Sequence, residues 1–220
     1  MARKLDVEPD CTRTRLLEAA GEIFAEHGFS ATTIQMISQR AGANIAAVNY
    51  YFGSKEKLYN EVLAYGRQIS GESATNPPEL RPGEDPHTAL ELFIRQYISR
   101  LVSPNRPQWY NKLVAREIAE PTSALDELIR IKIEPMRTRL SAILRRLHGD
   151  APAEVEQQFM ECVVGQCLFY YRCRHVILRL RGKTDYTEEL INEIAANITR
   201  FSLGGIASLM ERQPSGTAAN

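Results

Sequence analysis

Apolar residues recur along most of the chain at spacings of three and four, the repeat of an α-helix that buries one face. No convincing stretch alternates strictly between apolar and polar residues, as a half-buried β-strand would. The sequence therefore predicts an all-α protein. The expected helices cover about residues 14–27, 33–41, 45–51, 55–70, 87–102, 122–147, 152–180 and 187–210, with a short helix after Pro107.

Residues suited to helix ends support these boundaries. Gly28 stands where a left-handed residue would end the first helix, and Gly42 permits a tight turn after the second. Pro135 should kink or split the helix expected over 122–147, because proline has no amide hydrogen to donate. The side chains expected to cap the next three helices at their N-termini belong to Thr32, Asn44 and Ser54.

A segment rich in proline and glycine separates two helical regions. Residues 71–86 include Pro77, Pro78 and Pro82, a composition typical of a loop. We therefore expect an N-terminal domain over 1–70, a linker loop over 71–86, a larger domain over 87–212 and a flexible tail over 213–220.

The N-terminal region contains the pattern of a helix-turn-helix, in which two short helices meet at a tight turn and a preceding helix braces them. The helix expected over 45–51 would be the second of the two. An α-helix enters the major groove of DNA only if it protrudes, and side chains at its N-terminal end then reach base edges. The pattern therefore predicts a domain that binds double-stranded DNA.

Two stretches of this region, Thr33–Asn44 and Val48–Leu58, resemble the TetR family of bacterial transcription regulators. The most specific part is Tyr50-Tyr51-Phe52-Gly53-Ser54-Lys55-Glu56, and the resemblance extends over about Thr12 to Tyr65. It implies a three-helix helix-turn-helix domain, followed by a larger helical domain that binds a small molecule and forms a homodimer. A two-fold dimer matches a palindromic operator.

By position, the resemblance assigns DNA contacts to nine residues. Thr33 and Gln35 look like contacts to phosphate and base, and the small residues that follow the turn would favour thymine methyl groups. Asn49, where the family often has a different pattern, could read adenine or bind phosphate. Tyr51 and Lys55 should reach phosphates. The nine residues are Thr33, Gln35, Ile45, Ala46, Ala47, Asn49, Tyr50, Tyr51 and Lys55.

A purely structural role is the alternative for the apolar residues of this set. We expect Val48 and Phe52 to belong to the core, whereas Ile45 could face either the core or DNA. Tyr50 is either a second DNA contact or a packing residue.

Charge does not favour DNA binding by itself. The chain has 27 Lys and Arg against 27 Asp and Glu, and the stretch 1–67 is also neutral. Binding must therefore depend on where charges lie. Glu18, Glu22 and Glu26 recur every four residues and can form one face turned away from DNA. If Lys55 binds phosphate, Lys55→Ala should weaken binding to all DNA sequences alike.

The last two long helices are expected to form the dimer interface. The helix over 152–180 has one apolar stripe from Phe159 to Leu180 and a second at Cys162, Phe169 and Val176, so it should contact more than its own domain. The last helix has a further stripe at Ile191, Ile194, Ile198, Phe201 and Gly205, and Gly204-Gly205 would let two helices approach closely. An ordinary intrachain core is the alternative.

The resemblance places a small-molecule effector among the middle helices, and aromatic and apolar residues there suggest a largely apolar ligand. Arg116 and Glu117 belong to a stretch that looks like a subgroup associated with export genes and toxic compounds. A buried Arg116 would mark either a ligand carboxylate site or a structural bridge. Glu117 and Arg172 could add polar contacts. The predicted ligand-binding residues are Phe93, Tyr97, Trp109, Tyr110, Leu113, Arg116, Met136, Gln166, Phe169 and Tyr170.

Other functions have less support. The chain lacks the GxSxG and HExxH motifs and a phosphate-binding glycine loop, so we expect no enzyme, no cofactor and no metal site. Its four cysteines contain no CxxC pair and are expected to be free thiols; zinc binding by Cys162, Cys167 and Cys173 with a histidine is the alternative. With no apolar run of membrane length and no signal peptide, we expect a cytoplasmic protein. A helical binding module without DNA binding is the competing interpretation. Repression, with release from DNA by the small molecule, is the expected mode of regulation, and activation is the alternative because the sequence does not distinguish the two.

Overall fold

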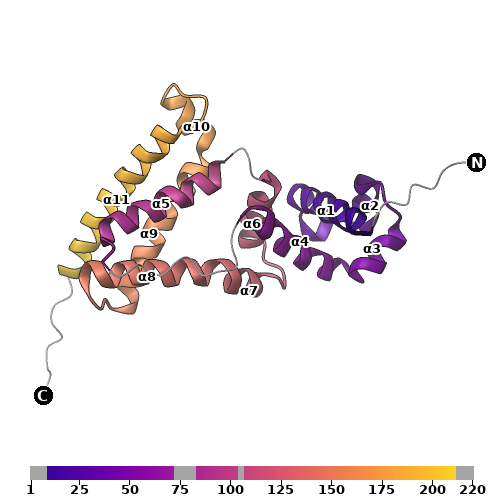
Figure 1. Cartoon of the computed structure of the whole chain (residues 1–220), viewed down its shortest axis with the longest axis horizontal. Helices are drawn as coiled ribbons and strands as arrows, with labels where there is room; N and C mark the ends of the chain where they lie inside the picture. The colour runs from indigo at the N-terminus through magenta and orange to yellow at the C-terminus, as the bar shows by residue number, and fades with distance from the viewer. Residues whose placement is uncertain (1–8, 72–82, 104–106, 212–220) are drawn as a thin grey trace, which may run out of the picture. The chain divides into compact units, whose positions relative to one another are not determined.

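A computed structural model describes residues 9–71, 83–103 and 107–211 (Figure 1). These residues form helices and no strands, which confirms the predicted all-α class. The chain divides into two compact units. The first spans Met1–Ala74 and Pro104–Lys132, and the second spans Thr75–Ser103 and Ile133–Asn220. The predicted tail and most of the predicted linker lie outside the described residues.

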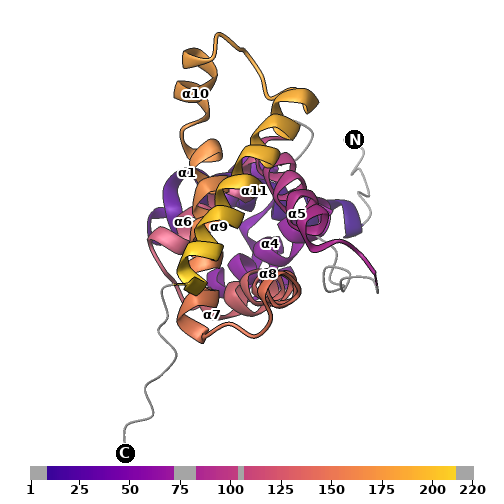
Figure 2. The same ribbon diagram turned by 90° about the vertical axis from the view of Figure 1, so that its left-hand side faces the viewer.

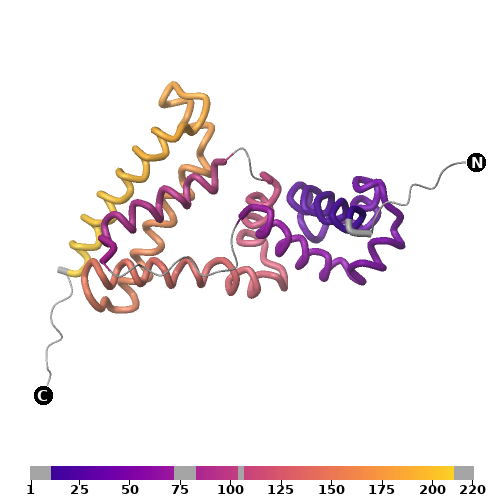
Figure 3. The backbone as a smooth tube through the Cα atoms, viewed as in Figure 1, coloured from indigo at the N-terminus to yellow at the C-terminus, as the bar shows by residue number. Residues whose placement is uncertain are grey.

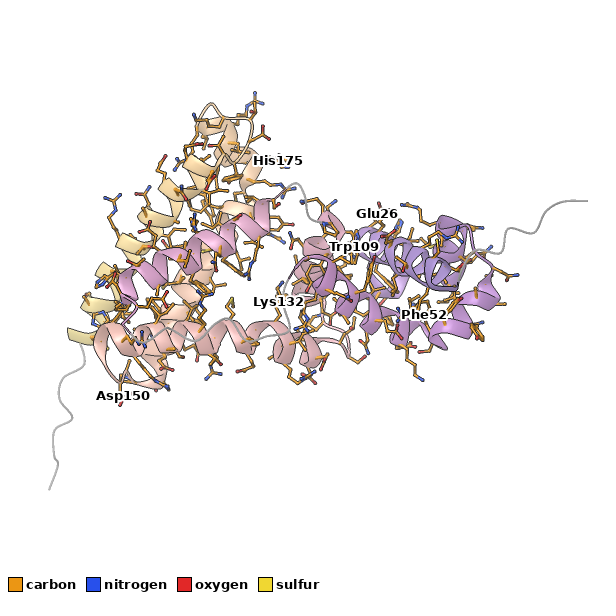
Figure 4. All side chains as sticks on the ribbon, in the orientation of Figure 1. Glu26, Phe52, Trp109, Lys132, Asp150 and His175 are labelled. Carbon is orange, nitrogen blue, oxygen red and sulfur yellow. The ribbon has the colours of Figure 1, made fainter. Side chains whose placement is uncertain are left out.

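The first unit is a helix-turn-helix braced by its neighbours. Helix α1 packs against α2, α4 and α6, while α3 contacts α2 and α4. Its core holds Leu16, Phe24 and Ile37, together with Val48 and Phe52, the two residues of α3 that were predicted to be buried. Phe52 is labelled in Figure 4. Its elements are α1 (Pro9–Ala31), α2 (Ile34–Ala41), α3 (Ile45–Phe52), α4 (Lys55–Ile69), α6 (Gln108–Ala119) and α7 (Leu125–Leu128).

The caps differ from the prediction at one position. Asn44 and Ser54 cap α3 and α4 as expected, and their side chains accept hydrogen bonds from the backbone amides of Ala46 and Lys57. Helix α2 is capped by Thr33 instead of Thr32. The Thr32 hydroxyl is buried and donates to the Gly28 carbonyl at 2.6 Å. Thr32 therefore belongs to the end of α1.

Helix α6 belongs to the first unit, although the sequence predicted a domain that ends at residue 70. The side chains of Trp109 and Tyr110 lie against Gly21 of α1 and Gly66 of α4. Trp109 is labelled in Figure 4. A Cβ atom on Gly66 would stand 2.4 Å from Tyr110 Cδ2, and one on Gly21 would stand 2.6 Å from Trp109 Cε3. The two glycines leave the space that α6 fills, so the packing depends on residues far apart in sequence.

The second unit is built around α5 (Pro86–Val102), which packs against α8, α9 and α11 (Figures 2 and 3). Its core includes Leu90, Ile94, Leu140 and Val163. The helix predicted over 152–180 is interrupted at Cys173. The other elements of this unit are α8 (Glu134–His148), α9 (Ala153–Arg172), α10 (Arg174–Leu180) and α11 (Glu188–Glu211).

The chain passes from the first unit to the second within a π-helical turn, Ile129–Ile133. Pro135 follows at the start of α8 and has no amide hydrogen for the carbonyl of Ile131, four residues earlier. The Arg67 guanidinium of α4 donates to that carbonyl at 3.3 Å instead. Residues 125–148 remain helical through this turn, so the predicted split at Pro135 is absent and a π-helical turn precedes the proline instead. The Arg67 side chain of α4 supplies a donor to the Ile131 carbonyl.

Candidate nucleic-acid interface

The exposed face of α3 consists of residues one helical turn apart. Ile45 and Tyr50 keep 45% and 82% of their surface exposed, although both are large and apolar. Ala46 and Asn49 are exposed as well. Because positions i and i+4 lie on the same side of a helix, these four residues form one outward ridge. We call Ile45, Ala46, Asn49 and Tyr50 the α3 ridge.

The turn before α3 fixes the start of this ridge. Gly42 has φ 60° and ψ 37°, a left-handed conformation that favours glycine. The Ala43 amide donates to the Ser38 carbonyl at 2.9 Å, and the Asn44 side chain caps the first turn of α3. Ala47 is half-buried and packs against the core, so the first turn directs only its outer residues to solvent.

The two adjacent tyrosines have different surroundings. Their rings meet edge to face at 5.1 Å, but Tyr51 is half-buried and packs against the core. Tyr50 is the open one, so its ring can reach a ligand without rearrangement of the core. A DNA contact by either tyrosine stays a prediction.

Helix α2 offers a smaller exposed edge. Thr33 and Gln35 are both exposed, and the Thr33 hydroxyl accepts a hydrogen bond from the Met36 amide at 3.2 Å. A cap of this kind uses the oxygen as an acceptor and leaves the hydroxyl hydrogen for a phosphate. The predicted phosphate contact of Thr33 is compatible with its cap role.

Lys55 has a different environment from the one that the sequence suggested. Its Nζ donates to the carbonyls of Phe29 and Thr32 at 2.9 and 3.0 Å, and it lies 4.4 Å from the centre of the Phe29 ring. The ammonium therefore fastens the start of α4 to the end of α1. Only its third hydrogen is left for a phosphate, so the predicted phosphate contact would be a secondary role.

Glu56 also bears on the N-terminus of α4. Hydrogen bonds from its own backbone amide and from Ser54 lower the pKa of the exposed Glu56 carboxyl. A carboxylate already occupies the position at which a helix N-terminus would attract phosphate. DNA that approaches α4 there meets a negative charge.

Several charged side chains of this unit are paired with side chains of opposite charge. Arg40 of α2 pairs with Glu22 at 2.6 Å and with Glu26 at 3.5 Å, and Arg13 pairs with Glu61. The acidic face of α1 is therefore partly neutralised by α2. What remains at α3 is an uncharged ridge that can read groove edges through shape and hydrogen bonds.

Four of the predicted ligand-binding residues belong to the packing of α6. Trp109, Tyr110 and Leu113 join the core of the first unit. Arg116 pairs with Glu120 at 3.4 Å and donates to the Glu26 carbonyl at 3.4 Å. Arg116 is half-buried, and these contacts join α6 to the C-terminal part of α1. A role of Arg116 in ligand binding stays a prediction.

Glu117 is completely buried and is held by three hydrogen-bond donors. The Tyr59 hydroxyl donates to Oε2 at 2.6 Å, while the Thr122 amide and hydroxyl donate to Oε1 at 2.8 and 3.0 Å. Burial, and then the bond to Glu117, raise the pKa of Tyr59. The network joins α4 to α6, a role that sequence spacing could not reveal because Tyr59 and Glu117 lie 58 residues apart.

The other six predicted ligand-binding residues lie in the second unit. Phe93 is buried, while Tyr97, Met136 and Tyr170 are half-buried against the core of that unit. Gln166 donates to the Cys162 carbonyl at 3.0 Å and to the Ser202 hydroxyl at 3.4 Å, which joins α9 to α11. Phe169 is 55% exposed. Three of the six lie together on α5 and α8 and could form one side of a ligand site: Phe93, Tyr97 and Met136.

The cysteines are free in the structure. Burial raises the pKa of the Cys167 thiol to about 12, which disfavours the reactive thiolate. Among the described residues no group of histidine, cysteine and acidic side chains could hold a metal ion, and no helix is long and apolar enough to cross a membrane.

A braced helix-turn-helix with an outward ridge, joined to a second helical unit, defines this protein as a DNA-binding transcription regulator. Residues 16–62 match the family described as bacterial regulatory proteins of the TetR family. Residues 86–206 match the C-terminal domain of the HTH-type transcriptional dual regulator CecR. The chain belongs to the TetR family of bacterial transcription regulators.

Similar proteins agree with this membership. CecR of Shigella flexneri is 28% identical over 204 residues, which cover 89% of this chain and 91% of that protein. The transcriptional repressor AcnR of Corynebacterium efficiens is 29% identical over 164 residues, or 71% of this chain and 80% of AcnR. The solved structure of HlyIIR, a hemolysin II transcriptional regulator, has a TM-score of 0.58 at 22% identity and covers 87% of this chain and 99% of its own. It supports the fold.

Proposed function

We propose that this regulator is a homodimeric repressor that binds a palindromic operator through the α3 ridge and is released by a small molecule. The observation that carries the proposal is the exposure of Tyr50 and Ile45 on a helix whose opposite face is buried. Large apolar side chains gain little from exposure to water, and groove edges with thymine methyl groups would cover them. Asn49 would read adenine, and Gln35 of α2 would add a contact to a base.

The second unit offers a surface for the homodimer. Phe169, Val176, Leu180 and Phe201 are exposed by 55%, 60%, 82% and 73%, although all four are apolar. On α11, Gly204 and Gly205 are exposed, and an added Cβ atom would meet nothing within 4 Å. A second copy of this unit could therefore approach α11 closely. We call these six residues the apolar face of α9–α11.

Part of the predicted dimer stripe has another role. Ile194 and Ile198 of α11 are buried within the unit, as the alternative of an intrachain core required, while Phe201 and Gly205 are open. The interface that we propose therefore involves the C-terminal part of α11 together with α9 and α10.

The route from effector to DNA would run through the π-helical turn. Arg67 of α4 bonds the Ile131 carbonyl that Pro135 leaves without its amide partner. A change in the geometry of this turn would shift α4, and α4 contacts α3. Repression is the proposed sign because AcnR is named a repressor, whereas CecR is named a dual regulator. Regulation of export or toxic-compound genes stays a prediction of the subgroup resemblance.

The proposal is tested by selecting DNA from a random library with the full-length protein. We expect enrichment of one palindrome with half-site centres about one helical turn apart or a multiple of it. Selection with Tyr50→Ala should lose the enrichment, and selection with the exposed control variant Gln68→Ala on α4 should keep it. Recovery of no shared sequence by the wild-type protein would favour a helical binding module without DNA binding.

A further inference from the structure

Arg139 of α8 is a half-buried cation that forms no ion pair at contact distance in the described part of the chain. Its guanidinium lies 5.5 Å from the centre of the Phe93 ring, and its one hydrogen bond goes to the Gln96 side-chain oxygen at 3.5 Å. An arginine has five N–H donors, so the described residues leave most of them unused. Placing a charge away from water without a counter-charge is unfavourable.

The surroundings of Arg139 increase this imbalance. Burial, and in second place the positive charge of Arg100, lower the pKa of the Arg139 guanidinium, while the charge of Glu84 acts in the opposite direction. Arg100 and Phe93 both lie on α5, seven residues apart and thus on the same side of that helix. Two cations face the same region.

Other arginines of the second unit are arranged differently. Arg137 is more than half exposed and pairs with Glu134 at 3.7 Å. Arg145 pairs with Glu156 at 3.6 Å, and Arg181 pairs with Glu193 at 2.9 Å. Within the described residues these three arginines have an acidic partner at ion-pair distance, and Arg139 has none. A half-buried guanidinium that loses hydration without such a partner gains little as a purely structural group.

An aromatic wall stands beside the guanidinium. The rings of Phe93 and Tyr97 stack at 6.0 Å with an interplanar angle of 9°. Met136, one turn before Arg139 on α8, packs half-buried against the same core. A flat apolar body fits such a wall, and a planar guanidinium pairs with a carboxylate or sulfonate through two parallel hydrogen bonds.

We propose that Arg139 is the anchor for an organic anion with a flat apolar body, and that this anion is the effector of the regulator. The inference rests on the proposed function and changes the expected ligand from a largely apolar molecule to an amphiphilic one. Arg139 would bind the acidic group, Arg100 would add long-range attraction, and the half-buried Tyr97 and Met136, supported by the buried Phe93, would contact the body.

Two fluorescent dyes with the same aromatic skeleton test this proposal. Anilinonaphthalene sulfonate carries a negative charge, and phenylnaphthylamine lacks it. We expect the full-length wild-type protein to bind the sulfonate about tenfold more tightly than the neutral dye. Arg139→Gln should remove this preference, Arg139→Lys should keep part of it because the charge remains, and Arg137→Gln should leave it unchanged.

The deciding quantity is the ratio of the affinities for the charged and the neutral dye. Thermal unfolding of each variant shows that the compared proteins are folded. Equal affinity of the wild-type protein for the two dyes overturns the proposal. So does a preference for the sulfonate that survives Arg139→Gln. DNA binding without dye is measured in parallel: a wild-type protein that binds no DNA refutes the proposed function, while the dye comparison still decides the anion site.

Discussion

At the scale of single residues, Tyr50 separates DNA binding from folding. Its side chain is 82% exposed and its ring contact is with Tyr51, so the core loses nothing when it is removed. We expect Tyr50→Ala to lower affinity for operator DNA about tenfold, with the thermal midpoint unchanged within a few degrees. Fluorescence anisotropy and circular dichroism measure the two quantities. An unchanged affinity would remove Tyr50 from the interface.

Substitution of Lys55 should affect stability as well as DNA binding. Its ammonium bonds the Phe29 and Thr32 carbonyls, and hydrogen bonds of charged groups contribute about 1.5–3 kcal/mol. We expect Lys55→Ala to lower the free energy of unfolding by about that amount and to weaken binding to all DNA sequences alike. Lys57→Ala, at an exposed position two residues later, is the matched control. Altered sequence preference in Lys55→Ala would show that this residue reads bases.

Removal of a negative charge at α4 should strengthen DNA binding. The Glu56 carboxylate is fully exposed at the N-terminus of α4, where a phosphate would otherwise be attracted. Glu56→Gln is expected to raise DNA affinity by about threefold at low salt and less at high salt, because screening weakens the repulsion. Titrations at two salt concentrations measure this. Weaker DNA binding by the variant would mean that Glu56 has a positive role.

Local sequence patterns predicted the structural roles of some residues correctly, whereas the roles of others depend on distant parts of the chain. Asn44, Ser54 and Gly42 act through neighbours within a few residues, so the sequence around them was sufficient. Lys55 has its partners 26 and 23 residues away. Its role depends on how α1 and α4 pack, and no local pattern carries that information.

At the scale of helices, the attachment of α6 through glycines can be tested. A Cβ atom on Gly66 would clash with the Tyr110 ring, and overpacking of a core costs about 1–3 kcal/mol. We expect Gly66→Ala to destabilise the protein by that amount in urea unfolding, despite the higher helix propensity of alanine. Ala64→Ser, at an exposed position of the same helix, should change stability by less than about 0.5 kcal/mol. Stabilisation by Gly66→Ala would contradict this packing.

The bond between Tyr59 and Glu117 predicts a dependence on alkaline pH. The pKa of Tyr59 is raised in the folded protein, so its contribution to stability is complete below the ordinary tyrosine pKa of about 10. It decreases as pH rises further, because the unfolded chain loses the proton first. Tyr59→Phe should be less stable at neutral pH and should show a smaller loss above pH about 10. An identical alkaline decline in both proteins would contradict the assignment.

The helices themselves were largely predictable, but their grouping was not. Periodicity located the long helices, and Pro135 lies just after the π-helical turn that replaces the regular α-helix at 129–133. The sequence assigned the residues after Pro107 to the second domain because they follow the proline-rich break. Their true neighbours are Gly21 and Gly66, whose small size says nothing about which aromatic residue will fill the space. Because α6 belongs to the first unit, the predicted ligand-binding residues lie in two different units.

At the scale of the whole molecule, the apolar face of α9–α11 should control assembly. Phe201→Glu places a charge on a residue that is 73% exposed in the single chain, so the protomer should still fold. We expect the variant to elute as a monomer and to lose most of its operator affinity, because two linked half-sites bind together. Ile118→Glu, 53% exposed on α6, is the control and should stay dimeric. Light scattering after size-exclusion chromatography reports the mass, and a dimeric Phe201→Glu would exclude this surface.

A chain with no net charge is expected to bind DNA selectively because one helix face is placed to enter the groove. The most direct test is binding of the purified protein to DNA that flanks its own gene, over a series of salt concentrations. We expect selective binding to one fragment, with affinity that falls by about a hundredfold or more between about 50 and 200 mM salt as phosphate contacts are screened. Equal, weak binding to that DNA and to unrelated DNA, with genome-wide selection also failing, would contradict the account.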